Sequence, residues 1–117
     1  MQMEPASFDG AAPVDGYGPG FFRVGGQVFH GPVLVTPRSV LSWGGFDDLE
    51  TLKTLIGQID VVFLGTGAEM ALAPASMIQT LEPQGVMVEP MATPTAARSY
   101  NVTLAEGRRV ACALIPV

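Results

Sequence analysis

The sequence predicts a single α/β domain built on a mixed β-sheet, and three observations support this prediction. Apolar runs near residues 61–64, 86–89 and 109–115 have the pattern of strands that are buried on both faces. The segments between these runs show the apolar periodicity of helices. Short crossovers in the order β-α-β-α-β make such strands parallel, with right-handed connections.

A β-hairpin region is predicted before these elements. The strand-like runs Phe21–Val24 and Gln27–His30 flank Gly25 and Gly26. Paired glycines supply the positive φ angles that a tight hairpin turn requires. The region either extends the mixed sheet or folds over its other face.

The domain organisation follows from length and composition. A chain of 117 residues is long enough for one domain with a substantial core. Residues 1–20 contain four glycines and three prolines, too many for a sustained regular element. We therefore expect residues 1–15 to form a flexible arm and residues 16–117 to form the single α/β domain.

Three helices are predicted. The first is capped by Asp47 or Asp48 and runs to about Ile56, with its leucines on one face. The second covers residues 74–83 and begins with a proline, which is favoured in a first turn. The third covers residues 93–106. A glycine follows each helix, as is common where helices stop.

The charge balance argues against nucleic-acid binding. The net charge is −5, from eleven acidic and six basic residues, whereas a nucleic-acid interface needs a basic face. Arg108 and Arg109 are expected to pair with Glu106 across the end of the third helix. The alternative is that these arginines bind an anion or a partner.

Hydropathy and the first residues bear on the compartment. The apolar runs are far shorter than the ~20 residues of a membrane-spanning helix, so no transmembrane segment is predicted. Residues 1–20 have acidic residues, no lysine or arginine and no apolar core, unlike secretory or mitochondrial targeting signals. The sequence therefore favours the cytoplasm. The alternative is the mitochondrial matrix, for a protein whose presequence has been removed.

No catalytic residue, metal ligand or cofactor is predicted. The single Cys112 lies in an apolar strand, which favours a small, buried and unreactive side chain. Without a second cysteine it cannot form an intrachain disulfide, so a reducing compartment fits. His30 is the sole histidine, and no nucleophile or second metal ligand stands in evident register with it.

The candidate binding site lies at the carboxyl ends of the parallel strands, where ligands of open parallel sheets bind. Gly65, Thr66 and Gly67 follow one strand, and Thr93 follows the next. The glycines indicate either a tight strand exit or a phosphate-binding loop, although no Gly-Lys-Ser/Thr signature accompanies them. Thr93 before Pro94 is typical of a helix cap, with a ligand contact as an additional role.

Three further residues are candidates for contacts with a ligand or a partner. Arg98 and Asn101 lie off the apolar stripe of the third helix. An asparagine in mid-helix is expected to have a hydrogen-bond partner, either the backbone or an adjacent loop. Trp43, beside two glycines, either anchors a loop or faces a partner.

Several segments together resemble a known family. They are the strand exit Gly65–Gly67, the turn Met91–Thr93, the helix segment Ala97–Asn101, the closure Glu106–Val110, and the opening Gly16–Phe22 with Trp43. Over nearly the whole chain from about Gly16, the sequence resembles the family of the mitochondrial NADH:ubiquinone oxidoreductase (complex I) assembly factor 3. That family also includes small, uncharacterised bacterial and archaeal relatives.

The resemblance implies a compact three-layer α/β domain with no established enzymatic activity. The mitochondrial member acts in complex I assembly, with partner proteins at the inner membrane. Many relatives have a cysteine where this chain has Ala97, which counts against thiol chemistry at that position.

Two hypotheses about function follow. The first is a non-enzymatic binding or assembly protein of the bacterial cytoplasm, with complex I subunits or assembly factors as partners. The second is a protein or enzyme that binds a small anionic molecule in the crevice at the strand ends. Its polar contacts would be Thr66, Thr93, Arg98 and Asn101.

Overall fold

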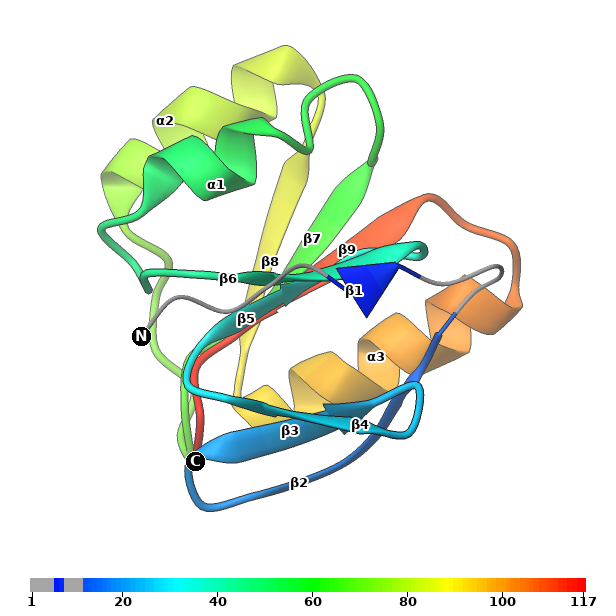
Figure 1. The fold of residues 1–117 in the computed structure, drawn as a ribbon. Coiled ribbons are helices and arrows are strands. Elements are labelled where there is room, and N and C mark those ends of the chain that lie inside the picture. The colour runs from blue at the N-terminus through cyan, green and yellow to red at the C-terminus, as the bar shows by residue number, and fades with distance from the viewer. Residues whose placement is uncertain (1–5, 8–11) are drawn as a thin grey trace.

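The computed structural model describes residues 6–7 and 12–117 and shows the predicted α/β fold (Figure 1). The strands are β1 Ala6–Ser7, β2 Val14–Gly18, β3 Phe21–Val24, β4 Gln27–His30, β5 Val33–Val35, β6 Ser39–Ser42, β7 Val61–Gly65, β8 Met87–Met91 and β9 Val110–Leu114. The helices are α1 Leu49–Lys53, α2 Ala75–Leu81 and α3 Thr93–Ala105, and a 3₁₀ turn, η1 Glu82–Gln84, follows α2. A six-stranded mixed sheet has the order β1-β6-β5-β9-β7-β8, and a three-stranded antiparallel sheet has the order β2-β3-β4.

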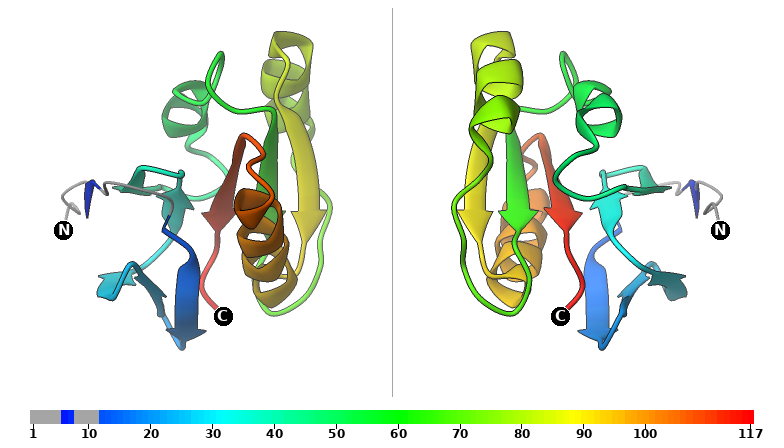
Figure 2. Two further views of the ribbon diagram at one scale, coloured as in Figure 1. Left: turned by 90° about the vertical axis from the view of Figure 1, so that its right-hand side faces the viewer. Right: turned by 90° about the vertical axis from the view of Figure 1, so that its left-hand side faces the viewer.

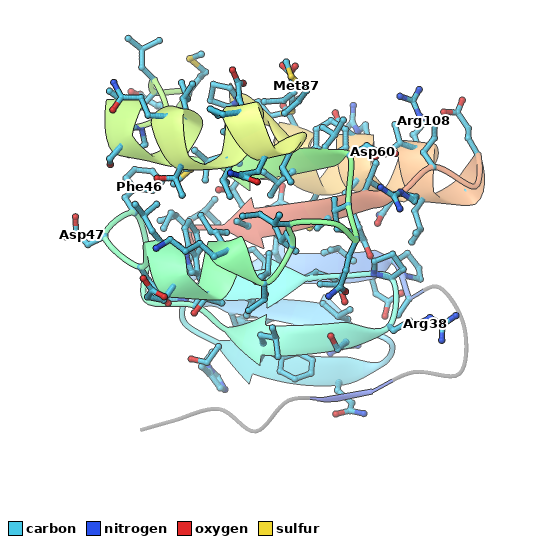
Figure 3. The ribbon with its side chains drawn as sticks, turned by 90° about the horizontal axis from the view of Figure 1, so that it is seen from above. Arg38, Phe46, Asp47, Asp60, Met87 and Arg108 are labelled. Carbon is cyan, nitrogen blue, oxygen red and sulfur yellow. The ribbon has the colours of Figure 1, made fainter. Side chains whose placement is uncertain are left out.

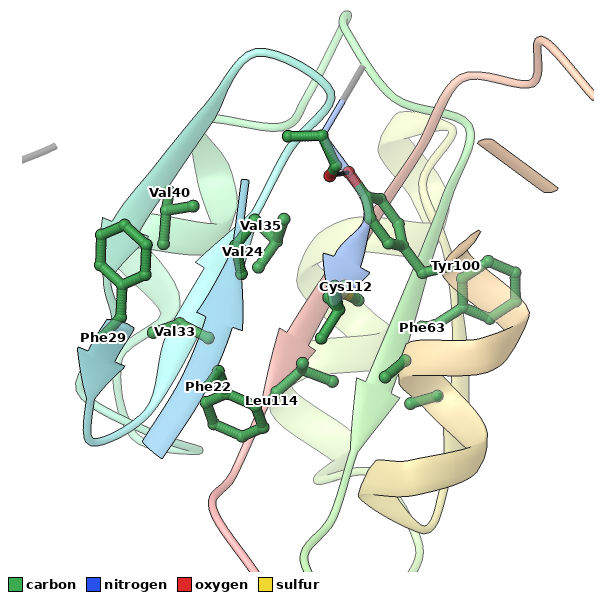
Figure 4. Packing of buried hydrophobic residues seen from close by; sticks show 14 of the residues in the cluster. Phe22, Val24, Phe29, Val33, Val35, Val40, Phe63, Tyr100, Cys112 and Leu114 are labelled. Carbon is green, nitrogen blue, oxygen red and sulfur yellow. Dashed lines mark hydrogen bonds between the residues drawn. The ribbon is translucent and has the colours of Figure 1, made fainter. Parts of the chain in front are cut away.

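The domain has three layers, as the views in Figures 1 and 2 show. Helices α1 and α2 cover one face of the six-stranded sheet, and α3 covers the other face together with the three-stranded sheet. Each face has its own apolar core. Figure 4 shows the core on the α3 face, whose large buried side chains are Phe22, Phe29, Phe63 and Tyr100.

The parallel part of the sheet is confirmed. Strand β7 lies between β8 and β9 and is parallel to both, whereas β5 is antiparallel to β9. Residues of β9 alternate between the two cores, which explains why this strand is apolar throughout. Cys112 and Leu114 face α3, and Ala111 and Ala113 face α1 and α2.

Helix α1 starts where its cap predicts and ends early. Asp48 is the N-cap: its Oδ1 accepts the N–H of Thr51 at 3.1 Å, and its Oδ2 accepts the Thr51 hydroxyl at 2.6 Å. These hydrogen bonds, that of the hydroxyl foremost, lower the pKa of Asp48. The helix ends at Lys53 instead of near Ile56, and turns continue to Gly57, whose φ is 83°. Helices α2 and α3 lie close to their predicted ranges.

The hairpin is confirmed, and its strands fold over the α3 face of the large sheet. Strands β3 and β4 pair around Gly25 and Gly26, which have φ values of 57° and 80°. Strand β2 then pairs with β3, so the expectation that residues 1–20 hold no sustained element is wrong for residues 14–18. Pairing with β3 and burial of Val14 stabilise this glycine-rich strand.

Most of the predicted arm, residues 1–15, lies outside the described part of the chain. Within that part, β1 pairs with β6, and β2 crosses the expected boundary between residues 15 and 16. The division itself stays a prediction.

Candidate functional site

The carboxyl ends of β7, β8 and β9 lie close together at one end of the large sheet. Gly65 ends β7, and a Cβ at this position would lie 2.8 Å from Oγ1 of Thr93 and 3.0 Å from its Cα. It would also lie 2.8 Å from a methyl group of Leu114. Glycine at position 65 therefore allows α3 to approach β7 closely.

The predicted cap role of Thr93 is wrong. Ala92 occupies the N-cap position without a side-chain cap hydrogen bond, and Thr93 is the first residue of α3. The Thr93 hydroxyl instead accepts the N–H of Gly67 at 2.8 Å and donates to the carbonyl of Ile115 at 2.7 Å. The side chain is fully buried and ties the exit of β7 to the end of β9.

Backbone hydrogen bonds also join these strand ends to one another. They run from the N–H of Thr66 to the C=O of Met91 at 2.9 Å, from Thr93 to Gly67 at 2.8 Å, and from Ile115 to Gly65 at 2.9 Å. Together with the Thr93 hydroxyl, these bonds use the N–H groups of Thr66, Gly67, Thr93 and Ile115 within the chain.

Thr66 orders the loop that follows β7. Its hydroxyl donates to the carbonyl of Glu69 at 2.7 Å and accepts the N–H of Ala71 at 2.9 Å. The loop presents two large apolar side chains to solvent: Met70 is 55% exposed and Leu72 is 82% exposed. Exposed apolar groups that occur together are typical of interaction surfaces.

Helix α3 holds β2 through Tyr100 and Asn101. The Oδ1 of Asn101 accepts the N–H of Val14 at 2.8 Å, and its Nδ2 donates to the C=O of Val14 at 2.9 Å. The backbone is thus the partner expected for this mid-helix asparagine. Tyr100 is buried beside it and donates to the carbonyl of Ala12 at 3.4 Å, and this burial raises the pKa of the phenol.

A cavity of about 240 Å³ lies between β2 and α3, and we call it the β2–α3 groove. Its lining residues are Val14, Asp15, Gly16, Tyr17, Pro94, Ala97, Arg98 and Asn101. The Arg98 side chain is exposed, and it forms no ion pair with the residues that the structure describes. The groove is therefore lined by strand β2, by the positively charged Arg98 and by small residues such as Ala97.

Trp43 anchors a loop inside the opposite core. Its side chain is buried among α1 and α2, away from α3. The indole Nε1 donates to the carbonyl of Asp48 at 3.1 Å, and the ring packs at a tilt against Phe46. Of the two roles predicted for Trp43, the structure supports the loop anchor, because the ring presents no surface to a partner.

The expected ion pair of Glu106 is replaced by another. Arg109 Nη2 lies 2.8 Å from Oδ1 of Asp60, and this hydrogen bond lowers the pKa of Asp60. The backbone explains why Arg109 pairs with Asp60. The N–H of Asp60 donates to the carbonyl of Arg109, which holds the two residues side by side at the start of β7 and β9. Figure 3 shows Asp60 and Arg108 toward the same end of the molecule.

The remaining reactive side chains do not form a cluster. Cys112 is fully buried, and burial raises the pKa of its thiol. His30 is exposed on β4 and lies at a tilt against Phe21. Among residues 6–7 and 12–117, no group of three or more His, Cys, Asp or Glu side chains could hold a metal ion.

The predicted site residues thus fall in three places. Gly65, Thr66, Gly67 and Thr93 meet at the strand ends, Arg98 and Asn101 lie at the β2–α3 groove, and Trp43 is buried on the other face. The groove residues on β2 were missed because this strand was not predicted. Two turn-forming prolines, Pro13 and Pro19, bracket β2 and are the signal that could have marked its limits.

Solved structures share this fold. The crystal structure of a Bartonella henselae protein, described as an outer membrane protein, matches with a TM-score of 0.83 and 32% identity, over 94% of this chain and 98% of that one. The solution structure of a Bordetella pertussis protein, described as a Mth938-like domain, matches with a TM-score of 0.78 and 27% identity, over 99% and 92%. The fold is therefore that of the Mth938-like domains.

A family model described as "Protein of unknown function (DUF498/DUF598)" matches residues 14–115, and the chain belongs to this family. An uncharacterised protein of Rhodobacter capsulatus is 52% identical over 100% of this chain and 94% of its own length. The zebrafish NADH dehydrogenase (ubiquinone) 1 alpha subcomplex assembly factor 3 is 34% identical, over 86% of this chain and 62% of that protein. The chain thus spans less than two thirds of this assembly factor, and the predicted family resemblance is confirmed.

Proposed function

We propose that this chain is a non-enzymatic protein-binding protein that assists the assembly of a respiratory NADH dehydrogenase, complex I. The support from relatives is that the similar zebrafish and human proteins are named complex I assembly factors. An assembly factor acts on other proteins, so the proposed partners are complex I subunits or further assembly factors. The chain matches 62% of the zebrafish and 65% of the human assembly factor, and its partners are therefore for experiment to identify.

The observation that carries the proposal is the contrast within the loop after β7. The Thr66 hydroxyl and the N–H groups of Thr66, Gly67 and Ala71 are used in hydrogen bonds within the chain. The apolar side chains Met70 and Leu72 of the loop are instead exposed. Such a loop offers little to an anionic ligand and much to an apolar patch of another protein.

The alternative of a small-molecule site has one observation in its favour, the position of Arg98 at the β2–α3 groove. This groove is not the crevice at the strand ends, to which the alternative was first assigned. Its volume of about 240 Å³ is below the roughly 300–1,000 Å³ of typical ligand pockets. We therefore favour protein binding.

A crosslinked pull-down of the tagged protein from its own cells, analysed by mass spectrometry, tests the proposal. We expect enrichment of NADH dehydrogenase subunits, and loss of this enrichment in the double variant Met70→Gln and Leu72→Gln. Val102→Gln is the matched control, because Val102 is an apolar residue of α3 with 54% exposure. Absence of NADH dehydrogenase subunits, or equal enrichment with all three proteins, would contradict the proposal.

The compartment is tested in the same cells. No helix among the described residues is long and apolar enough to cross a membrane. We propose the bacterial cytoplasm, and fractionation followed by immunoblotting should place the chain with cytoplasmic markers. Recovery with outer-membrane markers would contradict this location and would agree with the description of the Bartonella henselae protein.

A further inference from the structure

Strand β2 is an edge strand, and its outer edge faces the β2–α3 groove. The three-stranded sheet has the order β2-β3-β4, so within the described residues β2 pairs only with β3. The other side of β2 lines the groove together with Pro94, Ala97 and Arg98 of α3. An open strand edge presents unpaired backbone groups, which can pair with another extended chain.

Asn101 already acts on this edge as one residue of a neighbouring strand would. Its side-chain amide both accepts from and donates to the backbone of Val14, the two bonds that a paired strand residue makes. In an antiparallel pair, residues bonded to the partner alternate with residues that point away from it. The bonds to Asn101 show that the backbone N–H and C=O of Val14 point away from β3.

A β-bulge between Val14 and Gly16 resets this alternation, and beyond it Tyr17 is the residue whose backbone faces outward. Gly18 and Phe21 face each other across a two-residue turn, and the next pair along the strands is Tyr17 with Phe22. The N–H and C=O of Tyr17 therefore point to the outer edge. Its side chain is 46% exposed and forms one wall of the groove. Asn101 stands opposite Val14, so from Tyr17 to Asn101 the edge has room for about three residues of an added strand, at roughly 3.4 Å per residue.

The groove also has a charge preference. Arg98 lies on its α3 side, exposed and without an ion pair among the described residues. Asp15, the acidic residue of the groove, is directed to the hairpin turn, where its Oδ2 accepts the N–H of Gly26 at 2.9 Å. This bond fixes the Asp15 carboxylate at the turn without removing its charge, so the positive side of the groove is its α3 side, where a carboxylate complements Arg98.

We propose that the β2–α3 groove binds an extended, acidic peptide segment of a partner protein, which adds to β2 as a fourth strand. The peptide continues the edge that Asn101 begins, pairs with the backbone of Tyr17, and places a carboxylate against Arg98. The inference deepens the proposed function and rests on its premise that the chain binds proteins. It concerns a surface distinct from the Met70 and Leu72 loop.

The edge strands β8 and β4 lack this combination. Strand β8 ends the large sheet, and Pro90 removes one backbone donor from it. Strand β4 ends the small sheet, and its Val28 is 46% exposed, as Tyr17 is. Val28 pairs with Arg23 next to a two-residue turn, so its N–H also points outward, but no groove residue lies on β4. This edge is a matched control.

Selection of peptides on the purified full chain, from a random library displayed on phage, tests the proposal. We expect enriched peptides with an acidic residue among β-branched residues. Tyr17→Pro removes the outward donor of β2, a change that edge strands tolerate. It should weaken binding of the selected peptides about tenfold or more, whereas Val28→Pro should leave it unchanged. Equal effects of the two variants, or no enriched peptide, would overturn the proposal.

Charge reversal keeps the test independent of strand folding. Arg98→Glu should weaken the selected peptides about fivefold to tenfold, and replacing their acidic residue with its amide should have a similar effect. Arg38→Glu is the control, at an exposed arginine of the β5–β6 turn. Binding that is insensitive to Arg98→Glu would overturn the acidic preference.

Three further outcomes distinguish this inference from self-association of the chain and from the proposed function. If the chain forms dimers that Tyr17→Pro dissolves, a second copy occupies the edge and the proposal is wrong. If no peptide binds while the Leu72-dependent pull-down of NADH dehydrogenase subunits succeeds, the inference fails and the proposed function stands. Peptide binding without that pull-down supports the inference and removes the link to complex I.

Discussion

The strand ends of the parallel sheet and the β2–α3 groove are built from the same materials, and they differ in what they leave unpaired. Both use backbone amides, small residues and short polar side chains. At the strand ends, the hydroxyls of Thr66 and Thr93 bind only groups of the chain itself. In the groove, Asn101 satisfies Val14 and leaves the rest of the β2 edge and Arg98 available.

The difference shows how a general expectation is overridden by local packing. Open parallel sheets bind ligands outside their carboxyl ends because backbone groups remain unpaired there. Here α3 packs so closely on Gly65 that Thr93 joins two strand ends, and the N–H of Gly67 and the Thr93 hydroxyl are bonded within the chain. The unpaired backbone groups lie instead at the edge of the three-stranded sheet, where β2 has a neighbouring strand on one side only among the described residues.

The largest expected effect is that of Thr93→Val, which breaks the closure of the strand ends. The variant keeps the shape and leaves the N–H of Gly67 and the carbonyl of Ile115 without a partner. We expect the free energy of unfolding to fall by about 2–4 kcal/mol, measured by denaturant titration. Thr95→Val, at an exposed position of the same helix, should stay within about 0.5 kcal/mol of the parent. Equal effects would show that the Thr93 hydroxyl is not structural.

A pair of glycine variants compares the two regions directly. Gly65→Ala places a Cβ against Thr93 and Leu114, and we expect a loss of about 1–3 kcal/mol. A Cβ at Gly16 has no atom within 4 Å, so Gly16→Ala should change stability by about 0.5 kcal/mol or less. Thermal or denaturant unfolding of both variants measures the contrast. A larger loss from Gly16→Ala would mean that the groove is the more tightly packed region.

Asn101→Ala should have a smaller effect than Thr93→Val. The backbone of Val14 loses both of its bonds, but water can reach this partly buried position. We expect a loss of about 1–2 kcal/mol, together with faster hydrogen exchange of the Val14 amide. Gln79→Ala, at an exposed position of α2, controls for loss of an amide side chain. An unchanged exchange rate of the Val14 amide would show that the Asn101 side chain does not hold β2 in place.

The smallest expected effect is at Cys112, which tests whether the groove reaches the core. The thiol is fully buried in the cluster below β2 and α3, and its pKa is raised by that burial. A raised folded-state pKa contributes stability below the unfolded value of about 9 and loses it as pH rises above that value. We expect no reaction with a thiol reagent at neutral pH in the folded protein, and lower stability in alkali. Labelling at the rate of the unfolded chain would contradict a closed core.

Much of the fold could be predicted, because its signals are local. Continuous apolar runs marked β7 and β9, since both faces of these strands are buried. The run at β8 marked a strand too, but the expectation of burial on both faces is wrong there, because β8 is the edge strand and exposes Met87 and Glu89. Paired glycines marked the hairpin, and Asp47 or Asp48 marked the start of α1 as a cap, whose bonds reach only to Thr51, three residues after Asp48. The early end of α1 was missed, because turns through Gly57 compete with a short helix at little energetic cost.

The site was harder to predict, because its partners are distant in sequence. Thr93 has the local pattern of a cap, and its bonds to Gly67 and Ile115 arise only when three strands assemble. Asn101 revealed its need for a partner, but not that Val14, 87 residues away, would supply it. Strand β2 itself contains glycines that disfavour strands, and only its pairing with β3 and α3 compensates.

Native-state hydrogen exchange, followed residue by residue by NMR, tests the contrast between the two regions most directly. We expect slow exchange for the amides of Gly67, Thr66 and Ile115, which are bonded at the strand ends. The amide of Tyr17 should exchange far faster, because it points from the open edge of β2 into solvent. Slow exchange at Tyr17, or exchange at Gly67 as fast as at Tyr17, would contradict the account of a closed crevice and an open groove.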